Sequence, residues 1–306
     1  MADHRFRVMG CRARLSVDDE SAELLDDLVL AAHGHERRWT RFDDESEVSR
    51  MNQLAGTPVR VSAGTALLVD RARAAHLATG GWFDPLLLRE LVAAGYGESF
   101  ELIGAFGSSR LVVSGAEEAS RRPSIVGAEV DHDRHIVTLP DGAAFDPGGI
   151  GKGLAADLLA DQAVASGARW AIVDLGGDVR VEGENLEFGE FAVEVAHPDG
   201  GLICKVAMVS GAVATSGTGR RCWAGPSGDA RHHLIDPHTG MSARSDLLSA
   251  TVLAAECWWA EAVATAVVVA GRKRGAELLR DLGLPALTVD AQGAVGLHGP
   301  IEDYVL

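Results

Sequence analysis

Apolar residues recur every three or four positions in several stretches, which is the spacing of one buried face of an α-helix. Leu24, Leu25 and Leu28 share such a face at the start of a predicted helix over residues 21–41. Ser46 and Ser62 precede two more such stretches and are predicted to be N-caps. The helices predicted in this way span residues 21–41, 46–54, 62–79, 86–94, 154–166, 256–270 and 272–282.

Other stretches alternate apolar and polar residues, which is typical of strands with one buried face. Residues 5–17 are expected to form one opening strand that contains Met9-Gly10. Hairpin-like strands beside helices, without a repeating βαβ order, predict an α+β fold with mixed, largely antiparallel sheets and packed helices. The remaining strands are predicted at residues 135–139, 170–174, 179–181, 191–196, 203–209, 250–254, 286–290 and 294–297.

Composition narrows the class of protein. A chain of 306 residues with 47% hydrophobic residues can build one large domain or two closely packed ones. The net charge of −16, without a basic stripe, argues against nucleic acid or an anionic membrane as main partner. The four cysteines form no C-x-x-C pair, and the first residues lack the apolar run of a signal peptide. We therefore expect a cytoplasmic protein with reduced thiols and no membrane span.

Residues 146–153, DPGGIGKG, lie between a predicted strand and a predicted helix. Their four glycines allow a tight turn and a close approach of the backbone to a ligand. The helix N-terminus and Lys152 would suit an anion, and Asp146 adds an acceptor or a metal ligand. A glycine-rich turn without a ligand explains the same letters about equally well. The stretch matches neither a P-loop nor a dinucleotide-binding fingerprint.

Two further groups could carry chemistry. Glu261 and Thr265 are four residues apart on one predicted helix face, and their oxygens suit Mg²⁺ rather than zinc. A solvated Glu is the alternative, although the apolar neighbours make an unpaired carboxylate costly there. His233 could act as a general base or be a core histidine, and a transition-metal cluster of His232, His233 and His238 ranks below both.

The residues 82–85, WFDP, precede the helix predicted at 86–94. Trp82 and Phe83 could flank a flat ligand. Asp84 is expected to be the N-cap of that helix, which is the more common role of an aspartate before Pro85.

Five motifs occur in order along the chain. They are residues 146–153 followed by Asp157, 174–178 (DLGGD), 214–217 (ATSG), 233–240 (HLIDPHTG) and 260–266 (AEAVATA). Shorter matches occur at Met9-Gly10, residues 42–52 and residues 83–85. Together they resemble the ApbE family of FAD:protein FMN transferases, and the resemblance spans nearly the whole chain. It implies an ApbE-like fold over residues 1–306, as one domain or two intertwined subdomains.

The resemblance also implies a reaction and a site. FAD, the substrate, is cleaved at its pyrophosphate, FMN passes to a Thr or Ser hydroxyl of a partner flavoprotein, and AMP leaves, with Mg²⁺ bridging the phosphates. The metal ligands would be the backbone oxygen of Gly149 and the side chains of Glu261 and Thr265, and His233 would be the general base. The FAD contacts would be Met9, Phe42, Trp82, Phe83, Asp84, Asp146, Lys152 and Ile235.

Two positions depart from the family pattern. The family usually has Asp where this chain has Glu261, and some members have another carboxylate where it has Ala264. The alternative functions are an FAD pyrophosphatase that releases FMN and AMP, and an FAD-binding protein without turnover. The absence of a signal peptide or lipobox also differs from the exported members of the family, so we expect a cytoplasmic acceptor protein.

Overall fold

The computed structural model describes residues 1–98, 122–184, 189–219, 221–225 and 230–306. They form two compact units, each built from separate stretches of the chain. Unit 1 comprises residues 1–36, 149–217 and 246–306, and unit 2 comprises residues 37–148 and 218–245. The chain passes from unit 2 to unit 1 between Gly148 and Gly149, inside the glycine-rich stretch. The described residues contain no helix with the length and apolarity needed to cross a membrane.

Unit 1 is built on an eight-stranded sheet in which every neighbouring pair is antiparallel. This topology confirms the predicted α+β class. The strands, in spatial order, are β1 (Ala2–Val8), β2 (Cys11–Val17), β6 (Trp170–Leu175), β7 (Asp178–Gly183), β10 (Gly211–Gly217), β13 (Leu247–Ala254), β14 (Ala286–Asp290) and β15 (Val295–His298).

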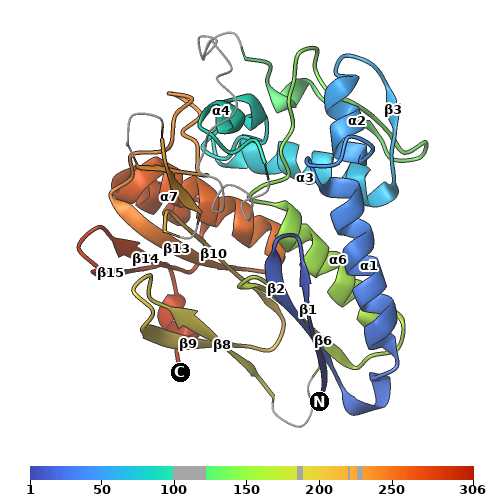
Figure 1. The fold of residues 1–306 in the computed structure, drawn as a ribbon. Helices are drawn as coiled ribbons and strands as arrows, with labels where there is room; N and C mark the ends of the chain where they lie inside the picture. The colour runs from blue at the N-terminus through green and yellow to red at the C-terminus, as the bar shows by residue number, and fades with distance from the viewer. Residues whose placement is uncertain (99–121, 185–188, 220, 226–229) are drawn as a thin grey trace. The chain divides into compact units, whose positions relative to one another are not determined.

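The two faces of this sheet are covered differently (Figure 1). The helices α6 (Gly151–Ala165) and α7 (Cys257–Leu282) pack against one face and against each other. On the other face, the hairpin of β8 (Phe191–Ala196) and β9 (Leu202–Met208) and the short helix η4 (Ile301–Asp303) share an apolar core with β7, β10, β13 and β14. The helix α1 (Leu24–Trp39) follows η1 (Asp19–Ser21), and its His33 contacts Phe6 of β1.

Two residues of α6 fix the start of α7. A Cβ on Gly153 would lie 2.4 Å from the carbonyl oxygen of Cys257, so only glycine allows the helices to approach this closely. Asp157, one turn later, accepts hydrogen bonds from the backbone N–H groups of Cys257 (2.8 Å) and Trp258 (2.9 Å). Asp157 thereby satisfies donors that the first turn of a helix leaves unpaired. The α6–α7 contact therefore sets where the next turn of α7, with Glu261, is placed.

Asp157 gives unit 1 a predicted pH dependence. Burial raises the pKa of Asp157 to about 7, although the two N–H groups and Arg180 favour its charged form. With this raised pKa, Asp157 binds a proton more tightly in the folded state than in the unfolded state. The stabilisation that protonated Asp157 contributes is therefore lost as the pH rises from about 4 to about 7. We expect the unfolding free energy to fall across this window relative to Asp157→Asn, by at most about 1.4 kcal/mol per pH unit. Urea unfolding of both proteins at a series of pH values measures the difference, and parallel curves would contradict the assignment.

Unit 2 contains the helices α2 (Glu47–Gln53), α3 (Ala63–Ala78) and α4 (Leu88–Ala93) and the short helix η3 (Ile125–Gly127). Ser46 and Ser62 accept N-cap hydrogen bonds from Ser49 and Thr65, which confirms both predicted caps. The strands of unit 2 are β3 (Val59–Arg60), β5 (Ile136–Thr138) and β4 (Glu129–Asp131), in that order in one sheet, and the pair β11 (Cys222–Ala224) and β12 (Ala230–His232).

Three local expectations were wrong. Residues 5–17 form a hairpin rather than one strand, because Met9 and Gly10 both adopt positive φ (52° and 67°) and turn the chain. The helix predicted at 154–166 begins at Gly151, so Lys152 lies in its first turn. The N-cap of α4 is Leu87 rather than Asp84. The Asp84 carboxylate instead accepts a hydrogen bond from Leu86 N–H (2.9 Å). By contrast, the break predicted between the last two helices is confirmed, because Gly271 inside α7 adopts non-helical angles (φ 75°, ψ 176°).

Candidate functional site

Unit 1 brings three charged side chains together at the start of α6. Lys152 contributes its ammonium from the first turn of the helix and lies 2.7 Å from Oδ2 of Asp178, the first residue of β7. The same ammonium forms an ion pair with Glu261 of α7, whose other oxygen accepts the N–H of Gly153 (2.8 Å). Asp178 and Glu261 are each only 2% exposed. The glycine-rich stretch and α7 thus meet at one buried cluster, although they are more than a hundred residues apart.

One ammonium faces two carboxylates in this cluster, which leaves a net charge of −1. Burial alone would lower the pKa of Lys152, but Asp178 and Glu261 outweigh burial and raise it above its usual value. Burial raises the pKa of Glu261, with the charge of Lys152 acting in the opposite direction. A buried group of net negative charge is costly unless a cation accompanies it.

Hydroxyl groups extend the cluster along the sheet. Thr265 lies one helical turn after Glu261, and its Oγ1 is 2.8 Å from Oγ of Ser216 on β10. The neighbouring Thr215 donates its backbone N–H to Asp178 (3.3 Å), and its hydroxyl lies 2.8 Å from that of Thr251. The ATSG motif therefore connects the carboxylate of Asp178 with the hydroxyl of Thr265.

The residues predicted to hold Mg²⁺ fit it in donor type and charge. Glu261 and Thr265 offer hard oxygens, and the net charge of −1 leaves room for a divalent cation. Gly149 adopts a positive φ of 82° two residues before α6, a conformation that favours glycine. Among the residues with described positions, no group of three or more His, Cys, Asp or Glu side chains is placed to hold a metal. A site here would depend on hydroxyl and backbone oxygens as well as on Glu261.

In unit 2, two predicted FAD contacts, Phe42 and Asp146, lie beside Arg41. Its guanidinium lies over the ring of Phe42 (4.2 Å) and of Tyr96 (4.7 Å), and its side chain is only 7% exposed. Arg41 Nε is 3.6 Å from Oδ1 of Asp146, and Arg41 also donates to the carbonyl of Tyr96 (2.7 Å). Arg41 is thus a buried cation between an aromatic pair and a carboxylate, and Phe42 is 48% exposed beside it.

The turn at residues 82–85 is joined to Asp146 through the backbone, because Asp146 N–H donates to the carbonyl of Pro85 (2.8 Å). The ring of Trp82 lies 4.6 Å from that of His238, centroid to centroid. Phe83 is 2% exposed, so its ring belongs to the core of unit 2, and its carbonyl lies 3.0 Å from Nδ1 of His76. Trp82 and Asp84 are half-buried and remain the accessible side chains of this turn.

The predicted base His233 follows β12 and is half-buried, with its backbone N–H donated to the carbonyl of Arg221 (3.3 Å). Ile235 packs in an apolar cluster with Leu87, Leu91, Ala94 and Tyr96. The adjacent His232 differs in role: its Nε2 lies 2.9 Å from the carbonyl oxygen of Ala243, and burial lowers its pKa. His232 is therefore held by backbone, as expected for a structural histidine.

The predicted site residues divide between the two units. Unit 1 brings Lys152, Glu261 and Thr265 together, and it also holds Gly149 and Met9, whose N–H donates to Glu36 (2.6 Å). Unit 2 holds the other predicted residues, Phe42, Trp82, Phe83, Asp84, Asp146, His233 and Ile235.

The sequence interpretation assigned no role to Asp178, Ser216 or Arg41. Asp178 and Ser216 belong to two of the recognised motifs, residues 174–178 and 214–217, but the motifs do not show which side chains they contact. Arg41 had no signal of its own beyond its place next to Phe42.

Comparison with known proteins shows the family of this chain. A FAD:protein FMN transferase of Treponema pallidum is 28% identical over 96% of this chain and 85% of that protein. One from Vibrio cholerae is 27% identical, covering 81% of this chain and 73% of its own length. The crystal structure of the ApbE protein from Thermotoga maritima is 26% identical, with a TM-score of 0.85 and coverage of 99% of this chain and 98% of that one. The ApbE family profile matches residues 9–288, and the chain therefore belongs to the ApbE family.

Proposed function

We propose that this protein transfers FMN from FAD to a Thr or Ser hydroxyl of a partner flavoprotein in an Mg²⁺-dependent reaction that releases AMP. The observation that carries the proposal is the buried Lys152–Asp178–Glu261 cluster at the glycine-rich stretch of an ApbE-family chain. Relatives that share most of this chain's length are named FAD:protein FMN transferases. A cluster that offers an ammonium, two carboxylates and neighbouring hydroxyls suits a metal-bound pyrophosphate.

The reaction is a displacement at phosphorus. The partner's hydroxyl oxygen attacks the FMN phosphorus, the bond from that phosphorus to the bridging oxygen breaks, and AMP leaves with that oxygen. His233 takes the hydroxyl proton. Such a reaction depends mainly on positioning and charge neutralisation, so the enzyme needs no nucleophile of its own.

This chain's residues have distinct tasks in that displacement. Lys152 supplies a positive charge near the phosphates, and Gly149, Glu261 and Thr265 would hold Mg²⁺, which neutralises phosphate charge when bound. Asp178 positions Lys152, and Ser216 positions the Thr265 hydroxyl. Met9, Phe42, Trp82, Asp84, Asp146 and Lys152 would contact FAD, and the buried Phe83 and Ile235 would support the contacts of unit 2 from its core. Arg41 would orient Phe42 and Asp146.

Replacing His233 with alanine is expected to lower the rate of FMN transfer by about 10²–10⁴-fold, the usual contribution of a general base. The measurement is AMP release and acceptor labelling over time at saturating FAD. His132→Ala is the matched control, because His132 is 53% exposed and lies 3.8 Å from Asp70 rather than near the predicted site. A His233→Ala rate within a few-fold of wild type would remove the general-base assignment.

One observation favours a different function, FAD binding without turnover. Both carboxylate oxygens of Glu261 already have partners, Lys152 and the N–H of Gly153. Isothermal titration of FAD with and without Mg²⁺, followed by analysis for AMP, separates the two. Equal affinity in both titrations and no AMP would favour simple binding, whereas free FMN and AMP with an unmodified acceptor would indicate an FAD pyrophosphatase.

A further inference from the structure

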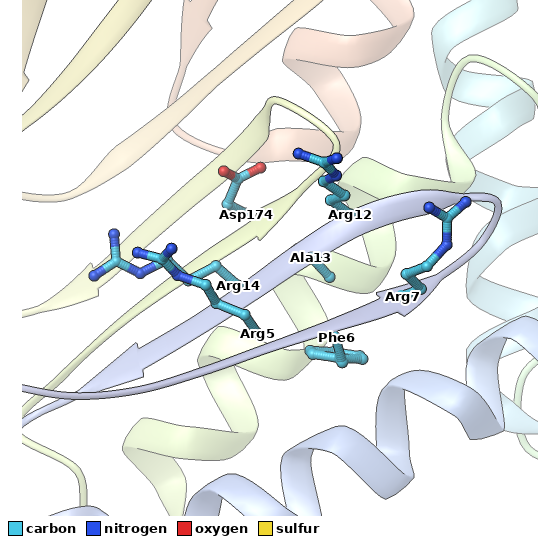
Figure 2. A pocket seen from close by; sticks show the side chains of 7 residues that line it. All are labelled: Arg5, Phe6, Arg7, Arg12, Ala13, Arg14 and Asp174. Carbon is cyan, nitrogen blue, oxygen red and sulfur yellow. The ribbon is translucent and has the colours of Figure 1, made fainter.

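Four arginines gather on one face of the β1–β2 hairpin. Arg5 pairs with Arg14 and Arg7 with Arg12 in the antiparallel register, so all four side chains point to the same side. They line an open hollow of about 500 Å³ together with Phe6, Ala13 and Asp174. Figure 2 shows Arg5 beside Arg14, with Arg7 and Arg12 nearer the turn of the hairpin. We call these four residues the arginine face.

The arginine face lies on the side of the sheet opposite the helices. Arg14 pairs with Asp174 of β6, which in turn pairs with Val179 of β7, and Val179 belongs to the core that β8 and β9 cover. The adjacent Ala13 and Leu15, which point the other way, are buried. The same side of the sheet is thus apolar where the β8–β9 hairpin packs and cationic at the β1–β2 edge.

Fold stability does not explain this arrangement. Like charges directly opposite one another on neighbouring strands are destabilising. Among the acidic side chains with described positions, Asp3 lies 3.5 Å from Arg5 and 3.4 Å from Arg14, and Asp174 lines the same hollow. Charges on an outer strand can prevent edge-to-edge aggregation, but Arg12 and Arg14 lie on the inner strand β2. Four arginines clustered on one face, in a chain of net charge −16, favour an anionic partner.

We propose that the arginine face binds an acidic, extended segment of a partner protein, which pairs with the edge of β1. The strand β1 ends the sheet, and no described strand pairs with its outer edge, so its backbone can accept another strand. Alternate carboxylates of such a strand would meet the guanidiniums, which bind carboxylates in a bidentate manner. A long polyanion fits less well, because the remaining acidic surface would repel nucleic acid or an anionic bilayer.

The place of the arginine face identifies the partner as the FMN acceptor, a step that rests on the proposed function. Arg7 and Arg12 flank the Met9-Gly10 turn, where Met9 is a predicted FAD contact. The carbonyl of Arg12 accepts the N–H of Gly176, in the turn that leads to Asp178. A strand bound along β1 would therefore run towards the Asp178 end of the sheet, where Lys152 and Glu261 are gathered.

The test is a titration that contains no flavin, so its result is independent of whether the protein transfers FMN. The probe is a fluorescent seven-residue peptide with glutamate at alternate positions, measured by anisotropy at low salt against the full chain. Arg7→Glu/Arg12→Glu is expected to weaken binding of the peptide at least 10-fold. The control Lys273→Glu/Arg274→Glu makes an equal charge change at exposed sites of α7 and is expected to weaken binding less than twofold. Arg7→Gln/Arg12→Gln, expected to weaken binding at least threefold, replaces the first pair if that pair does not fold.

Three results would overturn the proposal. The first is equal weakening in the α7 control, which would show a general charge effect. The second is equal affinity for the peptide with glutamine in place of glutamate. The third is tighter binding of a single-stranded oligonucleotide or of anionic vesicles than of the acidic peptide, with the same loss in Arg7→Glu/Arg12→Glu.

Discussion

Replacing Glu261 with glutamine is expected to lower the rate of FMN transfer by about 10²–10³-fold, as does the loss of one preorganised charge in other active sites. Glu261 is buried in the cluster with Lys152 and Asp178. The substitution keeps the shape of the side chain but removes the charge that would hold Mg²⁺, so the variant should also need a higher Mg²⁺ concentration for half-maximal rate. Initial rates of AMP release over an Mg²⁺ series measure both effects.

Glu261→Asp is the matched control for this experiment. It keeps the charge and introduces the residue that the family usually has, so transfer within about 10-fold of wild type is expected, since carboxylate ligation is retained. The unfolding free energies of both variants must be compared with wild type, because Glu261 also accepts the N–H of Gly153. A Glu261→Gln variant that folds, transfers FMN at the wild-type rate and shows an unchanged Mg²⁺ dependence would contradict the metal-ligand role.

Gly153→Ala is expected to have the largest effect on stability, lowering the unfolding free energy by about 3 kcal/mol or more, at the upper end for overpacking. The added Cβ would lie 2.4 Å from the Cys257 oxygen and 2.7 Å from the Trp258 Cα. Both are backbone atoms at the start of α7, so no side-chain rotation relieves the clash. Urea unfolding of the wild type and the variant measures the loss.

Gly201→Ala is the control for Gly153→Ala. Gly201 is exposed, and an added Cβ would have no atom within 4 Å, so a change within about 0.5 kcal/mol is expected. The tertiary clash then accounts for the difference between the two variants. A loss below about 1 kcal/mol in Gly153→Ala would mean that α6 and α7 can separate without cost, in conflict with overpacking as the cause.

The local features of this fold could be predicted from the sequence because they depend on neighbouring residues. Ser46 and Ser62 are N-caps, as predicted from a serine directly before a stretch of apolar residues at helical spacing. Residues 191–196 form a strand with the predicted limits. The hairpin at Met9-Gly10 was missed because Met9 adopts a positive φ that its side chain does not signal. The break in α7 at Gly271 could be predicted, because a glycine at a positive φ of 75° interrupts the helix locally.

The candidate site was predictable only as a set of motifs. Glu261 and Thr265 could be placed on one helix face, since their spacing is local. The pairing of Lys152 with Glu261 and Asp178 joins three distant elements, and no periodicity encodes it. The sequence predicts that Gly153 lets the backbone approach a ligand closely, whereas in the structure Gly153 is required for the contact between α6 and α7. Glycines of one motif can therefore serve packing and binding together.

The most direct test of the proposed function is mass spectrometry of a candidate acceptor protein after incubation with this protein, FAD and Mg²⁺. The account predicts that the acceptor gains one FMN, that AMP forms in equal amount, and that alanine in place of the acceptor's labelled Thr or Ser abolishes the gain. An unmodified acceptor together with free FMN and AMP would contradict it.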